Sequence, residues 1–166
     1  MQNGATRTVR FIVDDEARKA GSGCFENEGT IAELQDIIAN YQSRGYGVFY
    51  VANEAGPATG KNGFTCDDDV TNVRAIFADF DDGIPNTWHA RPPIIVKTSY
   101  VNGVQRGQAL WPVAGMSVAD FRQTQRRLAA HYGSDVAVIN PSRVLRLPGT
   151  LHLKNPANPQ LVNLVF

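Results

Sequence analysis

The chain has 166 residues, which is enough for one domain with a buried core, and its hydrophobic content of 43% is ordinary for a globular protein. Sixteen basic and sixteen acidic residues balance, so binding to nucleic acid or to an anionic membrane would need a local patch. The sequence has no apolar stretch of roughly 20 residues and no N-terminal secretory signal, which predicts a cytoplasmic protein that does not bind membranes.

The first half of the sequence predicts strands around one helix. Apolar and β-branched residues predict strands at residues 6–14, 46–53 and 73–80, the last two being "YGVFYVAN" and "VRAIFADF". Apolar residues at helical spacing predict a helix within residues 29–45 that ends at Gly45.

The second half predicts a hairpin, a helix and a final strand. "PIIVKTS" and "GQALWPV" are typical of two strands joined by a turn at Asn102 and Gly103. An amphipathic helix is predicted in residues 117–133, between a capping serine and a terminating glycine, and a strand in residues 160–166. This order predicts one mixed α/β (α+β) domain, residues 1–166, with a largely antiparallel sheet and flanking helices rather than a doubly wound fold.

The predicted strand at residues 73–80 runs into a group of carboxylates. Because strand side chains alternate, Asp79 and Asp81 project from one face, where ionised carboxylates repel each other unless they share a proton or bind a cation. Mg²⁺ suits such a site because proteins hold it by one or two carboxylates plus substrate phosphates. A strand end that enters a solvated turn at Asp82 and Gly83 explains the motif alone equally well.

A second polar group lies in "SRVLRLPGTLHLK". Arg143 and Arg146 flank an apolar pair. In the residues that follow, Thr150, His152 and Lys154 alternate with leucines, which predicts a polar, basic face. Such a face could clamp a polyphosphate beside a metal site, because guanidinium and ammonium groups bind phosphates. The alternative is a half-buried strand whose solvent face happens to be basic.

Together these segments resemble the archaeo-eukaryotic primase superfamily, in particular the RepB-like primase and primase-polymerase catalytic domains of plasmids and phages. The resemblance runs from about residue 46 to about residue 156. "VTNVRAIFADFDDG" resembles the first motif of that family and "KTSYVNGVQRGQALWPV" the second. "SRVLRLPGTLHLKNP" resembles the arginine-rich segment that follows the acid of the third motif.

The resemblance implies a DNA primase-polymerase core with an RRM-like module, which transfers nucleotidyl groups from NTP or dNTP to a 3′-hydroxyl on a single-stranded DNA template. It implies that two Mg²⁺ or Mn²⁺ ions are held by the catalytic residues Asp79, Asp81 and Asp135. The implied contacts to the nucleotide are Ser99, Gln108, Arg143, Arg146, His152 and Lys154. Gln108 stands where the family often has His, and Gln cannot supply a proton, so a general-acid role there loses support.

Contacts to the template and to further partners are also expected. Tyr100, in the predicted hairpin, could stack on a base, and Arg122 and Arg126 could form the local basic patch that the balanced charge requires. The resemblance places the protein in a bacterial host cell, encoded by a phage or plasmid. It also leaves open that the chain is a piece of a larger replication protein with a helicase or primer-binding domain. Residues 1–40 are expected to have a structural role only.

Two other functions remain consistent with the residues. A non-enzymatic module could bind single-stranded nucleic acid through its aromatic and basic residues, with the carboxylates playing a structural part. "FADFDDG" also resembles the nucleophile motif of haloacid-dehalogenase phosphatases. That family is less favoured, because a strand–helix–strand unit precedes the motif and no later pair of acids follows it.

Overall fold

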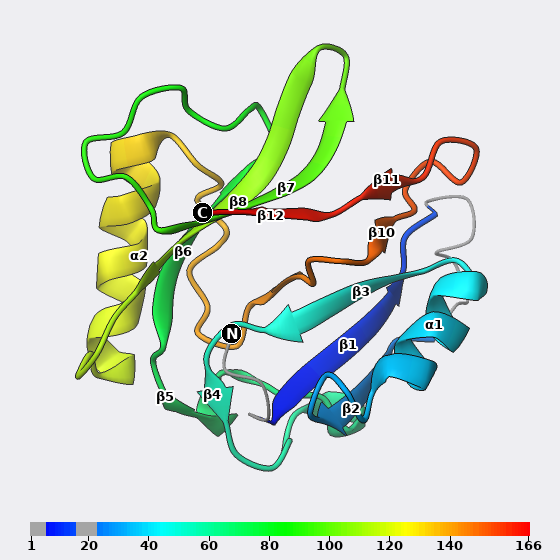
Figure 1. Cartoon of the computed structure of the whole chain (residues 1–166). Helices are drawn as coiled ribbons and strands as arrows, with labels where there is room; N and C mark the ends of the chain where they lie inside the picture. The colour runs from blue at the N-terminus through cyan, green and yellow to red at the C-terminus, as the bar shows by residue number, and fades with distance from the viewer. Residues whose placement is uncertain (1–5, 16–22) are drawn as a thin grey trace.

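A computed structural model describes residues 6–15 and 23–166 (Figure 1). The helices are α1 (Gln35–Ser43) and α2 (Val118–Tyr132). The strands are β1 (Arg7–Val13), β2 (Phe25–Gly29), β3 (Tyr46–Val51), β4 (Glu54–Ala55), β5 (Val70–Asn72), β6 (Ala75–Phe80), β7 (Ile94–Val101), β8 (Val104–Pro112), β9 (Val144–Arg146), β10 (Leu151–His152), β11 (Gln160–Leu161) and β12 (Asn163–Val165). Among the described residues, neither α-helix has the length and apolar character needed to cross a membrane.

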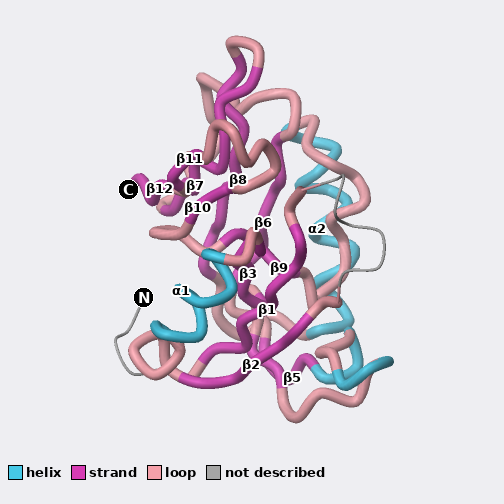
Figure 2. The backbone as a smooth tube through the Cα atoms, turned by 90° about the vertical axis from the view of Figure 1, so that its right-hand side faces the viewer, coloured by secondary structure: helices cyan, strands magenta, loops and turns pink. Residues whose placement is uncertain are grey.

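The strands form two four-stranded sheets, and every strand pair found among the described residues is antiparallel. Sheet 1 has the order β2-β1-β3-β9, and sheet 2 has the order β12-β7-β8-β6. Two short pairs, β4–β5 and β10–β11, complete the framework. The two helices lie on opposite sides of the molecule with the sheets between them (Figures 1 and 2). The expected α+β class with a largely antiparallel sheet is therefore confirmed.

The main core lies between the two sheets. Phe11 and Val48 of sheet 1 belong to the same buried cluster as Phe77 and Val96 of sheet 2, together with Phe121 of α2. A smaller cluster on the other face of sheet 2 contains three buried residues, Ala78, Phe80 and Ala109, against Leu128 of α2 and Trp88. Sheet 2 is thus covered on both faces. The side chains of β6 that precede the carboxylates are fixed by packing.

Local sequence signals place α2 and the β7–β8 hairpin where they were predicted. The hydroxyl of Ser117 accepts a hydrogen bond from the Asp120 N–H at 3.1 Å, and Gly133 ends the helix at a φ of 65°. The hairpin turns at Asn102 and Gly103, whose φ angles of 51° and 82° are left-handed. In Figure 1 its turn projects from the body of the molecule.

The first helix is shorter than predicted. The first residue of the predicted range, Gly29, ends β2, which pairs along β1, and turns occupy residues 31–34. The side chain of Glu33 accepts a hydrogen bond from the Thr30 N–H at 2.8 Å, and the Thr30 hydroxyl accepts from the Glu33 N–H at 3.2 Å. This reciprocal pair stabilises the turn ahead of the helix, so α1 begins at Gln35.

Candidate active site

Three of the predicted site residues meet where β6 ends. Asp79 lies opposite Gln108 in the β6–β8 register, and Asp81 follows directly after the strand. The loop after α2 reaches the same place, because the Asp135 N–H donates a hydrogen bond to the Asp79 carbonyl at 3.0 Å. The fold therefore brings Asp79 close to Asp135, which is 56 residues away in the sequence.

The electrostatics of Asp79 reflect this gathering. Burial, followed by the negative charges of Asp81 and Asp135, raises the pKa of Asp79 to about 6, although Gln108 and Arg143 act in the opposite direction. The guanidinium of Arg143 also lies 3.8 Å from the Asp135 carboxylate. One arginine thus offsets only part of the negative charge, and the site favours a cation.

The carboxylates have the right chemistry for a hard divalent cation, because Mg²⁺ and Mn²⁺ prefer oxygen ligands. Within the part of the chain that the structure describes, no group of three or more His, Cys, Asp or Glu side chains is already arranged to hold a metal ion. The assignment of Asp79, Asp81 and Asp135 as metal ligands therefore stays a prediction.

Gln108 links the carboxylate site to sheet 1. Its side chain is buried and forms a hydrogen bond with Asp79, while its Oε1 accepts a hydrogen bond from the backbone N–H of Arg146 at 3.1 Å. Because the oxygen is the acceptor for Arg146, the amide nitrogen is the group that donates to Asp79. In this structure Gln108 holds Asp79 and β9 together, a role that differs from the predicted contact with a nucleotide.

Arg146 forms a buried ion pair that the sequence analysis missed. Its two terminal nitrogens contact the two oxygens of Asp14 at 2.7 and 2.6 Å, and its guanidinium lies 4.5 Å from the centre of the Phe49 ring. A Cβ atom on Gly47 would come within 2.7 Å of the Asp14 carboxylate, so only glycine leaves room for the pair. Asp14 lies in the segment expected to be purely structural, and its position after β1 was the only available signal.

The predicted alternation around His152 is wrong. Thr150 is buried and its hydroxyl donates to the Leu147 carbonyl at 2.7 Å, whereas Leu151 is 37% exposed. Burial, and then the charge of Arg146, lowers the pKa of His152 to about 4, so this half-buried imidazole is neutral at pH 7. Lys154 is exposed. The strand-like face expected here does not form, because the chain turns at these residues and β10 contains only two of them.

Ser99 lies beside an arginine that the sequence analysis did not single out. Ser99 is buried and pairs with Arg106 across the β7–β8 register, after an irregularity at Lys97. Arg106 is two residues from Gln108 on β8, so both side chains project from the same face. The Arg106 Nε is buried and makes no hydrogen bond within the described part of the chain. The two-residue spacing between Arg106 and Gln108 was the sequence signal that could have identified Arg106 as a site residue.

The predicted template contacts lie on different elements. Tyr100 is on β7 and is 58% exposed. Arg126 is exposed on α2, where Arg122 forms an ion pair with Asp67 at 2.5 Å. The structure thus leaves Tyr100 and Arg126 accessible to a ligand, while Arg122 already has a carboxylate partner.

Comparison with known proteins identifies the family. Residues 3–161 match the family described as the RepB DNA-primase N-terminal domain. Among solved structures, the chain is similar to the AEP domain of the cyanophage S-2L primase-polymerase (PrimPol), with 25% identity, a TM-score of 0.72, and coverage of 97% of this chain and 80% of that chain. No curated protein sequence gives a significant match.

Two structures of the primase RepB′ have the same fold. The first has 17% identity and a TM-score of 0.66, and the match covers 98% of this chain but 51% of that chain, so this chain spans about half of its length. The second is the RepB′ catalytic domain in complex with initiator DNA, with 17% identity, a TM-score of 0.64, and coverage of 97% and 76%. The haloacid-dehalogenase alternative is not supported by any of these similarities. Because the family match extends over nearly the whole sequence, this chain belongs to the family of RepB DNA-primase N-terminal domains.

Proposed function

We propose that the chain is the catalytic core of a DNA primase-polymerase, which transfers nucleotidyl groups from NTP or dNTP to a 3′-hydroxyl on a single-stranded DNA template. Membership of the RepB primase family and the similarity to a phage PrimPol domain support this reaction class. The similarity to the RepB′ catalytic domain, which is in complex with initiator DNA, supports DNA as a partner.

The observation that carries the proposal is the accumulation of negative charge at Asp79. Burial, Asp81 and Asp135 together raise its pKa to about 6, as expected where a half-buried carboxylate lies beside others of the same charge. Divalent Mg²⁺ or Mn²⁺ ions bound at these three residues would stabilise the charge that develops on the transferring phosphate. The Gln108 side chain is fixed by the hydrogen bond that it accepts from the Arg146 N–H of β9, and it thereby orients the Asp79 carboxylate for metal binding.

The phosphates of the nucleotide require positive charge and hydroxyl donors beside the carboxylates. Arg143 is near Asp79 and Asp135, and Arg106 adds a guanidinium with a buried, unsatisfied Nε next to Ser99. We assign phosphate binding to these residues. Arg146 would reach a phosphate only by leaving Asp14, so its part in the site is to position β9.

The test is incorporation of labelled nucleotide on primed and unprimed single-stranded DNA with Mg²⁺ or Mn²⁺. Asp79→Asn keeps the size of the side chain and should reduce metal-dependent incorporation by at least about a hundredfold. Asp82→Asn, which removes a neighbouring but exposed carboxylate, is the matched control and should retain activity. Full activity in Asp79→Asn would overturn the assignment. Absence of product from the wild type, with single-strand binding that is indifferent to metal, would favour a non-enzymatic binding module.

A further inference from the structure

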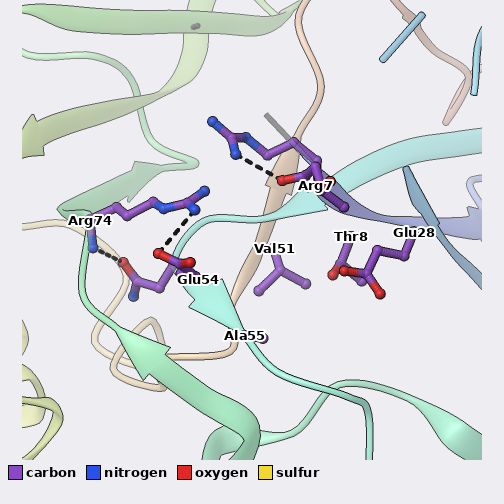
Figure 3. Close-up of a pocket in the computed structure, with 9 residues that line it drawn as sticks. Arg7, Thr8, Glu28, Val51, Glu54, Ala55 and Arg74 are labelled. Carbon is purple, nitrogen blue, oxygen red and sulfur yellow. Dashed lines mark hydrogen bonds and ion pairs between the residues drawn. The ribbon is translucent and has the colours of Figure 1, made fainter. Parts of the chain in front are cut away.

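A polar cavity lies at the opposite end of β6 from the carboxylates (Figure 3). It has a volume of about 270 Å³ and opens where β1 begins and β3 ends. About 13 Å of strand separates Ala75, which follows the lining residue Arg74, from Asp79. The cavity is therefore separate from the candidate active site.

Two guanidinium groups share one end of this cavity. The side chains of Arg7 and Arg74 reach toward each other above Glu54 (Figure 3). Glu54 is already engaged, because its Oε2 lies 3.0 Å from Arg74 and also accepts a hydrogen bond from the Asn72 side chain at 3.2 Å. The hydrogen bond of the Arg7 guanidinium goes to the carbonyl of the adjacent Thr6 at 2.9 Å. Burial, and then the positive charge of Arg74, lowers the pKa of Arg7, although Tyr50 and Glu54 act in the opposite direction.

The other end of the cavity carries hydrogen-bond acceptors. Thr8 and Glu28 are direct partners in the β1–β2 register. In Figure 3 their oxygens lie together on the side of the cavity away from the two guanidinium groups. A ligand that matches both ends must carry an anion at one end and a hydrogen-bond donor at the other.

We propose that this cavity binds a nucleotide unit, with its phosphate between Arg7 and Arg74 and a sugar hydroxyl or base amine directed toward Glu28. Arginine recognises phosphate through bidentate hydrogen bonds, and a carboxylate accepts hydrogen bonds from hydroxyl and amine groups. The volume lies near the lower limit for small-molecule sites, about 300 Å³, so the cavity admits one unit. The unit is supplied either as a free mononucleotide or as one nucleotide of a single strand.

Nuclear magnetic resonance of the ¹⁵N-labelled chain in EDTA tests the proposal. Titration with deoxyadenosine monophosphate, and separately with a ten-nucleotide single strand, should produce saturable shifts in the amides of Thr8, Glu54 and Ala55. Inorganic phosphate should shift the same amides with weaker affinity. Arg7→Gln and Arg74→Gln should each weaken binding at least about fivefold. Arg91→Gln, at an exposed position outside both sites, should bind like the wild type.

The two ligands distinguish the source of the nucleotide. Saturation by the monophosphate alone assigns a free nucleotide, and tighter binding of the strand with the same loss in Arg7→Gln assigns nucleic acid. Shifts confined to Asp79 and Gln108, or equal affinity of Arg7→Gln and wild type, would overturn the proposal. If Arg74→Gln does not fold, Arg7→Lys provides a second test. Lysine keeps the positive charge but cannot form the bidentate hydrogen bonds of arginine, so this variant should have an intermediate affinity. Because no metal or incorporation is involved, the result is independent of the primase-polymerase activity.

Discussion

Gln108 connects the two halves of the candidate site through one buried amide. Its oxygen accepts from the Arg146 N–H, and its nitrogen donates to Asp79. Gln108→Leu keeps the shape but leaves both groups without this partner, and we expect the free energy of unfolding to fall by about 2 kcal/mol. Chemical denaturation measures this change.

A matched variant on the same strand separates this effect from general strand weakening. The Gln105 side chain donates to the carbonyls of Ser99 and Arg106 at 2.9 Å, and these carbonyls belong to the projecting hairpin. Gln105→Leu should therefore cost less, about 1 kcal/mol. Equal losses in the two variants would contradict the role given to Gln108.

His152 makes the stability of the protein depend on pH. Its pKa is lowered to about 4, from an ordinary value of 6.5, first by burial and then by Arg146 and Lys154, against the opposing charge of Asp14. Below pH 6.5 His152 is protonated in the unfolded chain, whereas in the folded chain it stays neutral until the pH reaches about 4. His152 alone should thus lower the free energy of unfolding as the pH decreases through this interval, whereas Asp79, whose pKa is raised to about 6, contributes a change of opposite sign.

Denaturation curves between pH 7 and pH 4.5 measure this slope. His152→Asn removes one of the two titrating groups and leaves the contribution of Asp79, so the free energy of unfolding should increase as the pH decreases, relative to the wild-type profile. His131→Asn, at an exposed position on α2, is the control and should leave the slope unchanged. A His152→Asn profile with the same slope as the wild type would show that His152 does not contribute to the pH dependence.

At the scale of elements, a glutamine of α2 completes the free edge of sheet 2. β6 is the last strand of that sheet, and Gln125, which is 1% exposed, accepts from the Phe77 N–H at 3.0 Å and donates to the Phe77 carbonyl at 2.8 Å. The same nitrogen donates to the Val138 carbonyl at 2.9 Å, which ties the Asp135 loop to the strand. Gln125 therefore substitutes for a neighbouring strand.

We expect Gln125→Leu to lower the free energy of unfolding by about 3 kcal/mol, because it leaves buried backbone groups of β6 unsatisfied. Gln123→Leu, exposed on the same helix, should change it by less than about 0.5 kcal/mol. Thermal and chemical unfolding check both values. A Gln125→Leu protein as stable as Gln123→Leu would contradict the edge-capping role.

The elements that sequence reasoning predicted correctly are those specified by local signals. Ser117 caps α2, Gly133 ends it, and Asn102 with Gly103 supplies the left-handed turn of the hairpin. β2 was missed because its sequence, "FENEG", has no hydrophobic alternation, and only pairing with β1 makes it a strand. Such pairing is a tertiary contact that no local pattern encodes.

At the scale of the whole molecule, the candidate site also combines residues with a local sequence signal and residues without one. Asp79, Asp81 and Asp135 could be named from motifs, and the structure brings them together. The Asp14–Arg146 pair could not be predicted, because its members are 132 residues apart and the sequence does not reveal which carboxylate meets which guanidinium. The site therefore depends on sheet 1 as much as on sheet 2, although the motif carboxylates come from sheet 2 and the loop after α2.

Two buried ion pairs of sheet 1 allow this dependence to be measured. Asp14 pairs with Arg146 beside the site, whereas Glu26 pairs with Arg10 at 2.6 Å in the β1–β2 part of the sheet. Both carboxylate side chains are 7% exposed, so their neutral amide variants should lose comparable stability. Only Asp14→Asn frees Arg146 and loosens the strand that anchors Gln108.

If the proposed activity is correct, Asp14→Asn should lower kcat/KM for nucleotide incorporation about tenfold, while Glu26→Gln should retain nearly wild-type kinetics. The assay is run at a temperature where circular dichroism shows both variants folded, so that the comparison measures geometry and not unfolding. A small displacement of Arg146 is transmitted through Gln108 to Asp79, because each link is a single hydrogen bond in a buried chain. Equal losses in the two variants would mean that the site responds to general weakening of sheet 1 and not to this connection.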